Sequence, residues 1–424
     1  MRISGAAGLE SPTLRPGWIV VIASFFGVMV GFGSLVVYTF GVFLKPLSAE
    51  FHWSREAISR GFAFAALSVA VASPKLGQVL DRAGARRIMA PVFAIMGLGL
   101  VSLALLTPHL LHFYAVFIIL GLVGNATSQM GFSRPVCTWF SRRRGMALAL
   151  VIAGSSAGSM ALPALAQKLI DTYGWRMAYA GLGLLVFGIG LPVTLAFVRE
   201  RPGYVSHAPG VGSHRDIRGQ ALRSRVFWII IVTLFFGSIS VNGAITHLAA
   251  LLTDRGISPR IAAQTLSVLG AASLIGRIGT GWLLDRFFGP RVCFGLVLFM
   301  SAGIALLAGA RSAHAGMLAA ALIGIGIGGE SDVTPYLLTR YFGLSAFSTL
   351  YGLTWSAYAA AGAIGPVVMG RAFDLTGSYV SFLAIIAAGT LLSGSLMLAM
   401  PGYEALRAGG ADEICPNTTV PVTD

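Results

Sequence analysis

The sequence has few charged residues. Of its 424 residues, 11% are charged and 56% are hydrophobic, whereas a soluble domain carries about 25% charged residues. This composition excludes a soluble enzyme, a coiled coil and a disordered chain, and it predicts a multi-pass membrane protein. Twelve spans of about 25 residues would occupy about 300 positions, which leaves room for short loops and one longer linker.

Cysteine is scarce, and the motifs of common catalytic sites are absent. Cys137, Cys293 and Cys415 form no CxxC pair and no metal-ligand spacing, so neither a disulfide framework nor a metal site is indicated. The sequence has no GxxxxGK[ST], GxSxG or HExxH motif. We therefore expect neither an ATP-driven pump nor an enzyme, and we predict no catalytic residues and no cofactor.

Long apolar runs are what the sequence has in abundance. Six fall in the first half, at residues 18–44, 54–80, 87–107, 111–138, 145–170 and 175–198, and six in the second, at 225–252, 258–284, 291–310, 314–339, 347–371 and 377–400. Backbone groups in lipid must be satisfied within their own segment, and these runs are too long for barrel strands. Each run is therefore predicted to be a helix, which makes the fold an all-α membrane protein with twelve transmembrane helices.

The polar stretches between and after these runs suggest a division of the chain. We expect an N-terminal six-helix half at 1–198, a cytoplasmic linker at 199–224, a C-terminal six-helix half at 225–400 and a disordered cytoplasmic tail at 401–424.

The net charge of +14 comes from 30 Lys and Arg against 16 Asp and Glu. In a membrane protein this excess belongs in the cytoplasmic loops, so no nucleic-acid partner is expected. With the N-terminus placed inside, 18 basic residues fall on the cytoplasmic side, nine fall in or beside the outer loops, and Lys75, Arg134 and Arg277 lie within spans. The bias predicts that both termini are cytoplasmic, in a plasma (inner) membrane.

The two halves of the sequence resemble each other. Residues 77–87 read GQVLDRAGARR and residues 281–291 read GWLLDRFFGPR, with Gly, Asp and Arg repeated at an offset of 204. DTYGW at 171–175 and DLTGSY at 374–379 form a second pair at an offset of 203. We therefore expect two six-helix pseudo-repeats, and parallel six-helix repeats are the layout of the major facilitator transporters.

Several motifs carry a family resemblance. The 77–87 loop resembles the signature of the major facilitator superfamily. WFSRRRGMALALVIAG from Trp139 resembles the start of helix 5 in monocarboxylate transporters, and PGW at 16–18 and YGWR at 173–176 also fit that family. GIGGESDVTPYLLTRYFGL from Gly326 resembles bacterial members of the broader group, which includes oxalate/formate antiporters.

The resemblance implies a transporter of small carboxylates that works by alternating access. Arg277 aligns with the arginine that binds the substrate carboxylate in that family, and it alone carries over residue for residue. Tyr38 stands where proton-coupled animal members have a lysine, and Ser273 stands where they have an aspartate. Proton coupling would therefore depend on other residues of this chain. Three alternatives stay open: antiport of two acids, export of hydrophobic compounds by the same fold without a need for Arg277, and a non-transporting sensor.

Charged side chains within spans need a partner or a role, because each costs about 2.5–3.5 kcal/mol on insertion. Arg277 is the candidate carboxylate clamp, since a guanidinium binds a carboxylate through two parallel hydrogen bonds, and a structural ion pair is the alternative. Glu330 and Asp332 are candidates for coupling or gating. They lie about 200° apart on their helix, so both cannot face one cavity. Arg134 is a candidate inner gate, unless it snorkels to the cytoplasm.

Polar and aromatic residues of spans 1, 4, 7 and 11 are further candidates for substrate binding, although each also suits an ordinary helix-packing contact. They are Tyr38, Asn125, Gln129, Asn242, Trp355 and Tyr358. His247 has a side chain that titrates near neutral pH. Because it lies toward the outer end of its span, we expect it to be solvated.

The 77–87 loop and its copy predict a cytoplasmic charge network. The resemblance implies that it acts as a latch for the outward-facing state, and plain topology signalling is the alternative. The residues are Gly77, Asp81, Arg82, Arg86, Asp285 and Arg286. The predicted partners are a small carboxylate, protons and the lipid bilayer, and the protein is expected to be a monomer.

Overall fold

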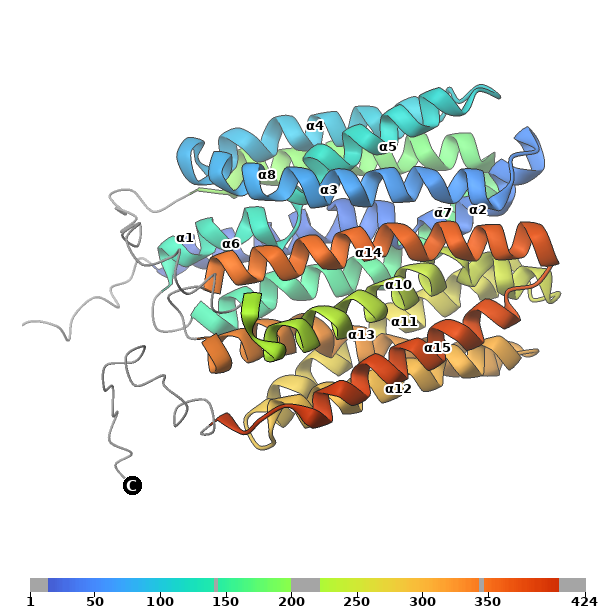
Figure 1. Ribbon diagram of the computed structural model, residues 1–424. Coiled ribbons are helices and arrows are strands. Elements are labelled where there is room, and N and C mark those ends of the chain that lie inside the picture. Colours follow the sequence, from blue (N-terminus) through green and yellow to red (C-terminus); the bar gives the residue numbers. More distant parts are fainter. Residues whose placement is uncertain (1–13, 141–143, 200–221, 343–346, 404–424) are drawn as a thin grey trace, which may run out of the picture.

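The structure, a computed structural model, describes residues 14–140, 144–199, 222–342 and 347–403, and every regular element in these ranges is helical. The helices lie side by side along one common direction (Figure 1). Helix α1 begins and α15 ends at the same end of the bundle, which we call the terminal end (Figure 1). The opposite end is called the far end.

The first half of the bundle contains α1 (Leu14–Met29), η1 (Gly33–Val37), α2 (Phe40–Phe51), α3 (Arg55–Ala83), α4 (Ala85–Leu103), α5 (Leu110–Gly124), η2 (Asn125–Thr127), α6 (Gln129–Trp139), α7 (Arg144–Leu185), η3 (Val186–Gly190) and α8 (Leu191–Phe197). The second half contains α10 (Arg225–Asp254), α11 (Pro259–Leu284), α12 (Gly289–Gly309), α13 (Ala313–Phe342), α14 (Phe347–Thr376), α15 (Val380–Ser395) and η4 (Leu396–Ala399).

Ten segments of the described chain are long and apolar enough to cross a membrane. One of them, Met146–Phe197, is 52 residues long and contains two crossings, because the backbone turns at Gly174 within α7. Helix α14 is 30 residues long and supplies the remaining crossing. The twelve-helix, all-α membrane fold predicted from the apolar runs is confirmed.

Two runs predicted as single helices are interrupted, so that detail was wrong. The run at 18–44 breaks between α1 and η1, and the run at 111–138 breaks at Ser128 between η2 and α6. The two breaks contact each other, because the backbone N–H of Phe32 donates to Thr127 Oγ1 at 2.9 Å. A side chain from another helix thus accepts the backbone bond that a continuous helix would make internally.

The repeat pairs seen in the sequence have a structural basis. Gly174 and Gly377 both take left-handed φ angles, 81° and 68°, which glycine adopts without a steric penalty. Helices α3 and α11 both begin after a capping serine, Ser54 and Ser258, whose side chains accept from Ala57 N and Ile261 N.

The two halves meet along two main seams, α3 against α14 and α7 against α11, with α2 also contacting α10. The backbones approach closely at glycines in both seams. A Cβ on Gly270 would lie 2.7 Å from the backbone N of Met160, and a Cβ on Gly370 would lie 2.9 Å from the backbone of Arg55. Small residues at helix interfaces permit this close packing in a membrane.

Candidate functional site

Tyr38 and Arg277 come from opposite halves of the bundle and lie near each other. Tyr38 follows η1 at the point where the first crossing bends, and Arg277 lies within α11. Both side chains are half-buried, and the phenol lies within the electrostatic field of the guanidinium. A cation and a hydroxyl therefore converge where the two halves meet.

Tyr358 and Asn242 extend this polar cluster within the second half. Ser238 Oγ donates to the backbone carbonyl of Tyr358 at 2.6 Å, and Asn242 Nδ2 donates to the carbonyl of Ser238 at 2.9 Å. The Tyr358 phenol interacts with the side chains of Asn242 and Ser238 and lies in the field of Tyr38. Helices α10 and α14 therefore present amide and hydroxyl groups close to the Tyr38 and Arg277 pair.

An aromatic row runs along α14 beside this cluster. The rings of Trp355 and Tyr358 are stacked, with centroids 5.5 Å apart and planes 18° apart. Tyr351 continues the row with its ring centroid 6.4 Å from that of Trp355. Trp355 is 38% exposed, so an apolar surface stands open next to the polar groups. Such a combination suits a small organic ion that has a charged end and an apolar end.

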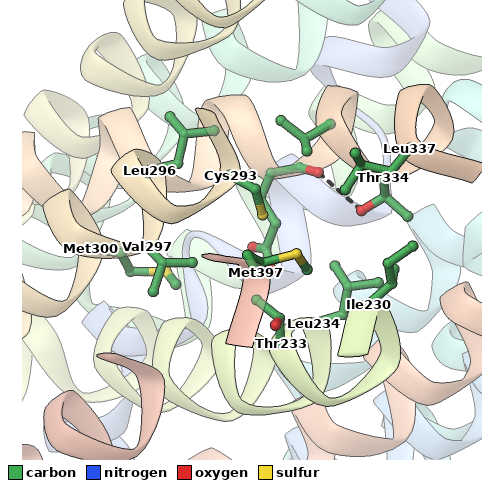
Figure 2. Close-up of a pocket in the computed structure, with 13 residues that line it drawn as sticks. Ile230, Thr233, Leu234, Cys293, Leu296, Val297, Met300, Thr334, Leu337 and Met397 are labelled. Atoms are coloured by element: carbon green, nitrogen blue, oxygen red, sulfur yellow. Dashed lines mark hydrogen bonds between the residues drawn. The ribbon is translucent and has the colours of Figure 1, made fainter. Parts of the chain in front are cut away.

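Glu330 of α13 borders a cavity of about 20 Å³ inside the second half, between α10, α12, α13 and η4 (Figure 2). The cavity has room for about one water molecule. The cavity walls are apolar apart from Thr233, Cys293, Thr334 and Glu330 itself. A Cβ on Gly237 would lie 2.7 Å from Glu330 Oε1, so this glycine makes room for the carboxylate. The Tyr358 phenol of the polar cluster also lies within the electrostatic field of Glu330, so the cavity lies near that cluster.

Asn125 makes packing contacts at the break between α5 and α6. Its side chain is buried, and Nδ2 donates to Ser73 Oγ of α3 at 2.7 Å. Its Oδ1 accepts from Ser128 Oγ at 3.0 Å. These bonds tie α3 to the break.

Part of the predicted set lies outside the described side chains. These residues are Gly77, Asp81, Arg82, Gln129, Arg134 and Asp332. The described members of the cytoplasmic set, Arg86, Asp285 and Arg286, are exposed. The Arg286 guanidinium lies 4.0 Å from the ring centroid of Trp282, and Arg86 borders a surface hollow together with Arg87 and Arg199.

A network of charges at the far end was not predicted from the sequence. Arg55 at the start of α3 donates from Nη2 to Asp254 Oδ1 of α10 at 2.9 Å and from Nη1 to Asp254 Oδ2 at 2.5 Å. Lys45 Nζ lies 2.7 Å from Asp254 Oδ1. Arg55 also donates to the Tyr379 hydroxyl, and its guanidinium carbon lies 3.6 Å from the ring centroid of Phe373.

Asp374 of α14 adds a second link between the halves. Its carboxylate accepts from the backbone N–H groups of Arg55, at 3.1 Å, and Glu56, at 2.8 Å. The negative charge thus caps the N-terminus of α3, where the helix dipole favours an anion. The repeat pair DTYGW and DLTGSY was the one sequence signal that pointed to this position.

His247 belongs to the same network, and the expectation that it would be solvated is wrong. Its side chain is fully buried. Nε2 lies 2.9 Å from the carbonyl of Pro366 and 3.1 Å from Ser59 Oγ, and Nδ1 lies 3.1 Å from the Tyr379 hydroxyl. The residue lies near a helix end, but α3 and α14 cover that face. We refer to Lys45, Arg55, His247, Asp254, Asp374 and Tyr379 as the far-end network.

Twelve crossings in two repeats, joined along two seams around a polar and aromatic cluster, define the architecture of a secondary transporter. Comparison with known proteins agrees. The family model of the Major Facilitator Superfamily matches residues 18–366, and the chain belongs to this family. It is a multi-pass membrane transporter of a small-molecule substrate and not an enzyme.

Curated relatives include two kinds of protein. "Monocarboxylate transporter 13" of Bos taurus is 28% identical over 402 residues, which cover 93% of this chain and 91% of the relative. "Uncharacterized MFS-type transporter YhjX" of Escherichia coli is 25% identical over 354 residues, which cover 81% of this chain and 85% of the relative. The resemblance to monocarboxylate transporters inferred from the motifs is thus confirmed at modest identity.

Solved structures share the fold at lower identity. A bacterial homologue of the human lysosomal transporter Spinster, described as inward-facing and unoccupied, has a TM-score of 0.69 and 16% identity, covering 94% of this chain and 98% of its own. The nucleoside transporter NupG has a TM-score of 0.73 and 14% identity, covering 91% of this chain and 100% of its own.

Proposed function

We propose that this chain carries a small carboxylate, a monocarboxylate or a related organic acid, across the membrane by alternating access. The observation that supports the proposal is that Arg277 of the second half lies near Tyr38 of the first half. A guanidinium binds a carboxylate through two parallel hydrogen bonds, and a phenol adds a further donor. The names of the monocarboxylate transporter relatives support this substrate class.

The proposed binding site combines Arg277 and Tyr38 with Asn242, Tyr358 and Trp355. Arg277 would bind the carboxylate, and the amide and hydroxyl groups would bind a second polar group of the acid. The exposed Trp355 ring, stacked on Tyr358, would cover its apolar part. Gln129 and Asn125 remain proposed members from the fourth crossing, with Asn125 acting through the bonds that hold the helix break.

The far-end network suggests which conformation the structure represents. We place both termini in the cytoplasm, as the distribution of basic residues favours, so the far end is extracellular. Bonds between the halves then close the outer side, as expected for an inward-facing state, with 1–198 and 225–400 as the two moving halves. Arg134 and the 77–87 loop, with its copy at 281–291, are proposed to act on the inner side as gate and latch.

Proton coupling is the second part of the proposal. Glu330 and Asp332 are the proposed proton carriers. Because Glu330 borders an apolar cavity between α10, α12 and α13, a change in its charge would act on the packing of these helices and so on the conformation. Movement of one monoanion with one proton is electroneutral, so transport would respond to the pH gradient and little to voltage.

Uptake of labelled pyruvate, lactate and oxalate into proteoliposomes under an inward proton gradient tests the proposal. We expect gradient-driven uptake by the wild type, loss of at least 90% in Arg277→Gln, and little rescue in Arg277→Lys, which keeps the charge without the paired donors. Uptake that requires acid preloaded inside would instead establish antiport. If no acid moves through correctly folded wild-type protein, the carboxylate proposal fails, and apolar compounds become the substrates to screen.

A further inference from the structure

The hydrogen bonds of His247 fix its protonation pattern. The carbonyl of Pro366 can only accept, so the Nε2 atom at 2.9 Å carries a proton and donates it, with Ser59 Oγ as a second neighbour at 3.1 Å. In a neutral imidazole Nδ1 is then an acceptor, and the Tyr379 hydroxyl donates to it at 3.1 Å. The Tyr379 oxygen in turn accepts from Arg55 Nη1.

These bonds form one directed chain between the two halves. Arg55 of α3 donates to Tyr379, Tyr379 donates to His247 of α10, and His247 donates to the backbone of α14. Ser59 on α3 also contacts the imidazole, so His247 itself bridges the halves. Arg55 Nη1, the Tyr379 hydroxyl and His247 Nε2 each have an acceptor in this arrangement, as a buried polar network requires.

A second proton on His247 is incompatible with this arrangement. Nδ1 would become a donor, so the Tyr379 oxygen would have to accept from both Nδ1 and Arg55, and the hydroxyl proton would lose its acceptor. An imidazolium and a guanidinium would also share one buried hydroxyl. The nearby charges are Arg55 of α3, Asp254 of α10, Lys45 of α2 and Asp374 of α14, and both oxygens of Asp254 already bind Arg55.

We propose that the far-end network is a proton-operated latch, in which protonation of His247 releases the contact of α3 with α10 and α14. The inference rests on the proposed alternating-access function. When the far end opens, His247 meets water, where a histidine titrates near pH 6.5. Protonation therefore favours the open far end, and the closed state is stable above that pH and gives way as the pH falls.

A distance measurement between the halves tests the latch without any substrate. His109 and His314 are exposed at the far end on opposite halves. Cysteines at these two positions, in a chain with Cys137, Cys293 and Cys415 replaced by alanine, accept spin labels and remove two competing histidines. Double electron–electron resonance in lipid nanodiscs between pH 8 and pH 5 then reports the populations of closed and open far ends.

We expect a longer distance to gain population as the pH falls, with the ratio of open to closed rising at least tenfold from pH 8 to pH 5. His247→Gln should abolish this change, because glutamine donates and accepts without titrating. His52→Gln, at an exposed far-end histidine, is the matched control and should keep the full response. A wild type whose distances ignore pH, or a His247→Gln variant with the wild-type response, would overturn the latch.

A second variant tests the latch independently, in case His247→Gln does not fold. Tyr379→Phe keeps the titrating imidazole but removes the hydroxyl that joins it to Arg55. We expect it to populate the open far end already at pH 8, and a closed, pH-responsive Tyr379→Phe protein would also refute the latch. The proposed substrate and the proposed latch are tested separately. A protein that changes conformation with pH but moves no acid refutes only the substrate proposal, and acid uptake without a pH-dependent conformational change refutes only the latch.

Discussion

The two seams between the halves are related by the repeat, yet they are built from different chemistry. In the α3 and α14 seam, Asp374 accepts two backbone N–H groups from the opposite half, and Arg55 binds Asp254 and Tyr379. In the α7 and α11 seam, the repeat counterpart Asp171 accepts from Gln167 Nε2 at 2.7 Å, within its own helix. That seam is made instead by Gly270 packed on the backbone of Ser159 and Met160.

This difference indicates that the two seams have different roles in the conformational change. Charge-paired bonds have a direction and a partner, so they hold one conformation and release it when the charge changes. Contacts between small residues have no such bonds to break, so helices can slide or pivot on them while they stay close. We infer that the α3 and α14 seam opens at the far end and that the α7 and α11 seam acts as the pivot.

The largest expected effect comes from disrupting the pivot. Gly270→Leu places a side chain 2.7 Å from the backbone N of Met160, which cannot move aside without shifting α7. We expect substrate uptake into proteoliposomes to fall more than tenfold. Gly279→Leu is the control on the same helix, because nothing lies within 4 Å of a Cβ there. Equal uptake by the two variants would contradict the pivot.

Breaking the charged seam should shift the conformational equilibrium. Arg55→Gln removes the donor that links α3 to Asp254 and Tyr379, and losing one partner of a part-buried pair is costly. We expect the open far-end population, measured with labels at 109 and 314, to rise about tenfold at pH 8. Arg60→Gln, which removes an exposed pair within α3, should leave the distances unchanged. An Arg55→Gln protein as closed as the wild type would refute the role of this seam.

The repeat-related aspartates offer a matched pair of smaller changes. Asp374→Asn weakens a cap across the seam, whereas Asp171→Asn weakens a bond inside α7. Loss of a helix cap costs about 0.5–2 kcal/mol, and Asn keeps one acceptor oxygen, so Asp374→Asn should raise the ratio of open to closed by about two- to fivefold, which corresponds to the low end of that range. Asp171→Asn should not change it. A similar shift in both variants would mean that the two seams do not differ in function.

The smallest effect is expected at an ion pair that does not cross a seam. Glu50, beyond the candidate membrane span Pro16–Val37, accepts from Trp175 Nε1 and pairs with Arg176 in the same half. These two partners lower the pKa of Glu50, so its stabilising effect is present at neutral pH and is lost as the pH falls through that lowered pKa. Glu50→Gln should reduce stability by about 0.2–1 kcal/mol at pH 7.

Thermal unfolding in detergent checks this effect, and the difference from wild type should shrink as the pH falls below the ordinary glutamate pKa of about 4.3. Label distances at 109 and 314 should match the wild type. A pH-independent loss of stability would show that the Glu50 charge is not responsible.

Hydropathy predicted the crossings because it is a property of each segment alone. Hydropathy did not predict the helix break beside Phe32, because the residues around it are apolar. The Phe32 amide donates to Thr127, which lies 95 positions away in the sequence. The repeat explained why glycine recurs at 174 and 377, where both backbones need a positive φ.

Site residues were harder to predict, because their neighbours come from distant segments. Motif resemblance selected Arg277 and drew attention to Tyr38, and the structure brings these two together. The burial of His247 was not predictable from its place near a helix end, because it depends on α3 and α14. The pairing of Arg55 with Asp254 likewise joins residues 199 positions apart.

Direct binding tests the central claim, a carboxylate held by Arg277 between the halves. Isothermal titration of purified protein with pyruvate, lactate and oxalate would compare the wild type with Arg277→Gln and Arg55→Gln. We expect the wild type to bind at least one acid, and we expect this binding to be retained in Arg55→Gln and lost in Arg277→Gln. Undiminished binding in Arg277→Gln would contradict the central claim.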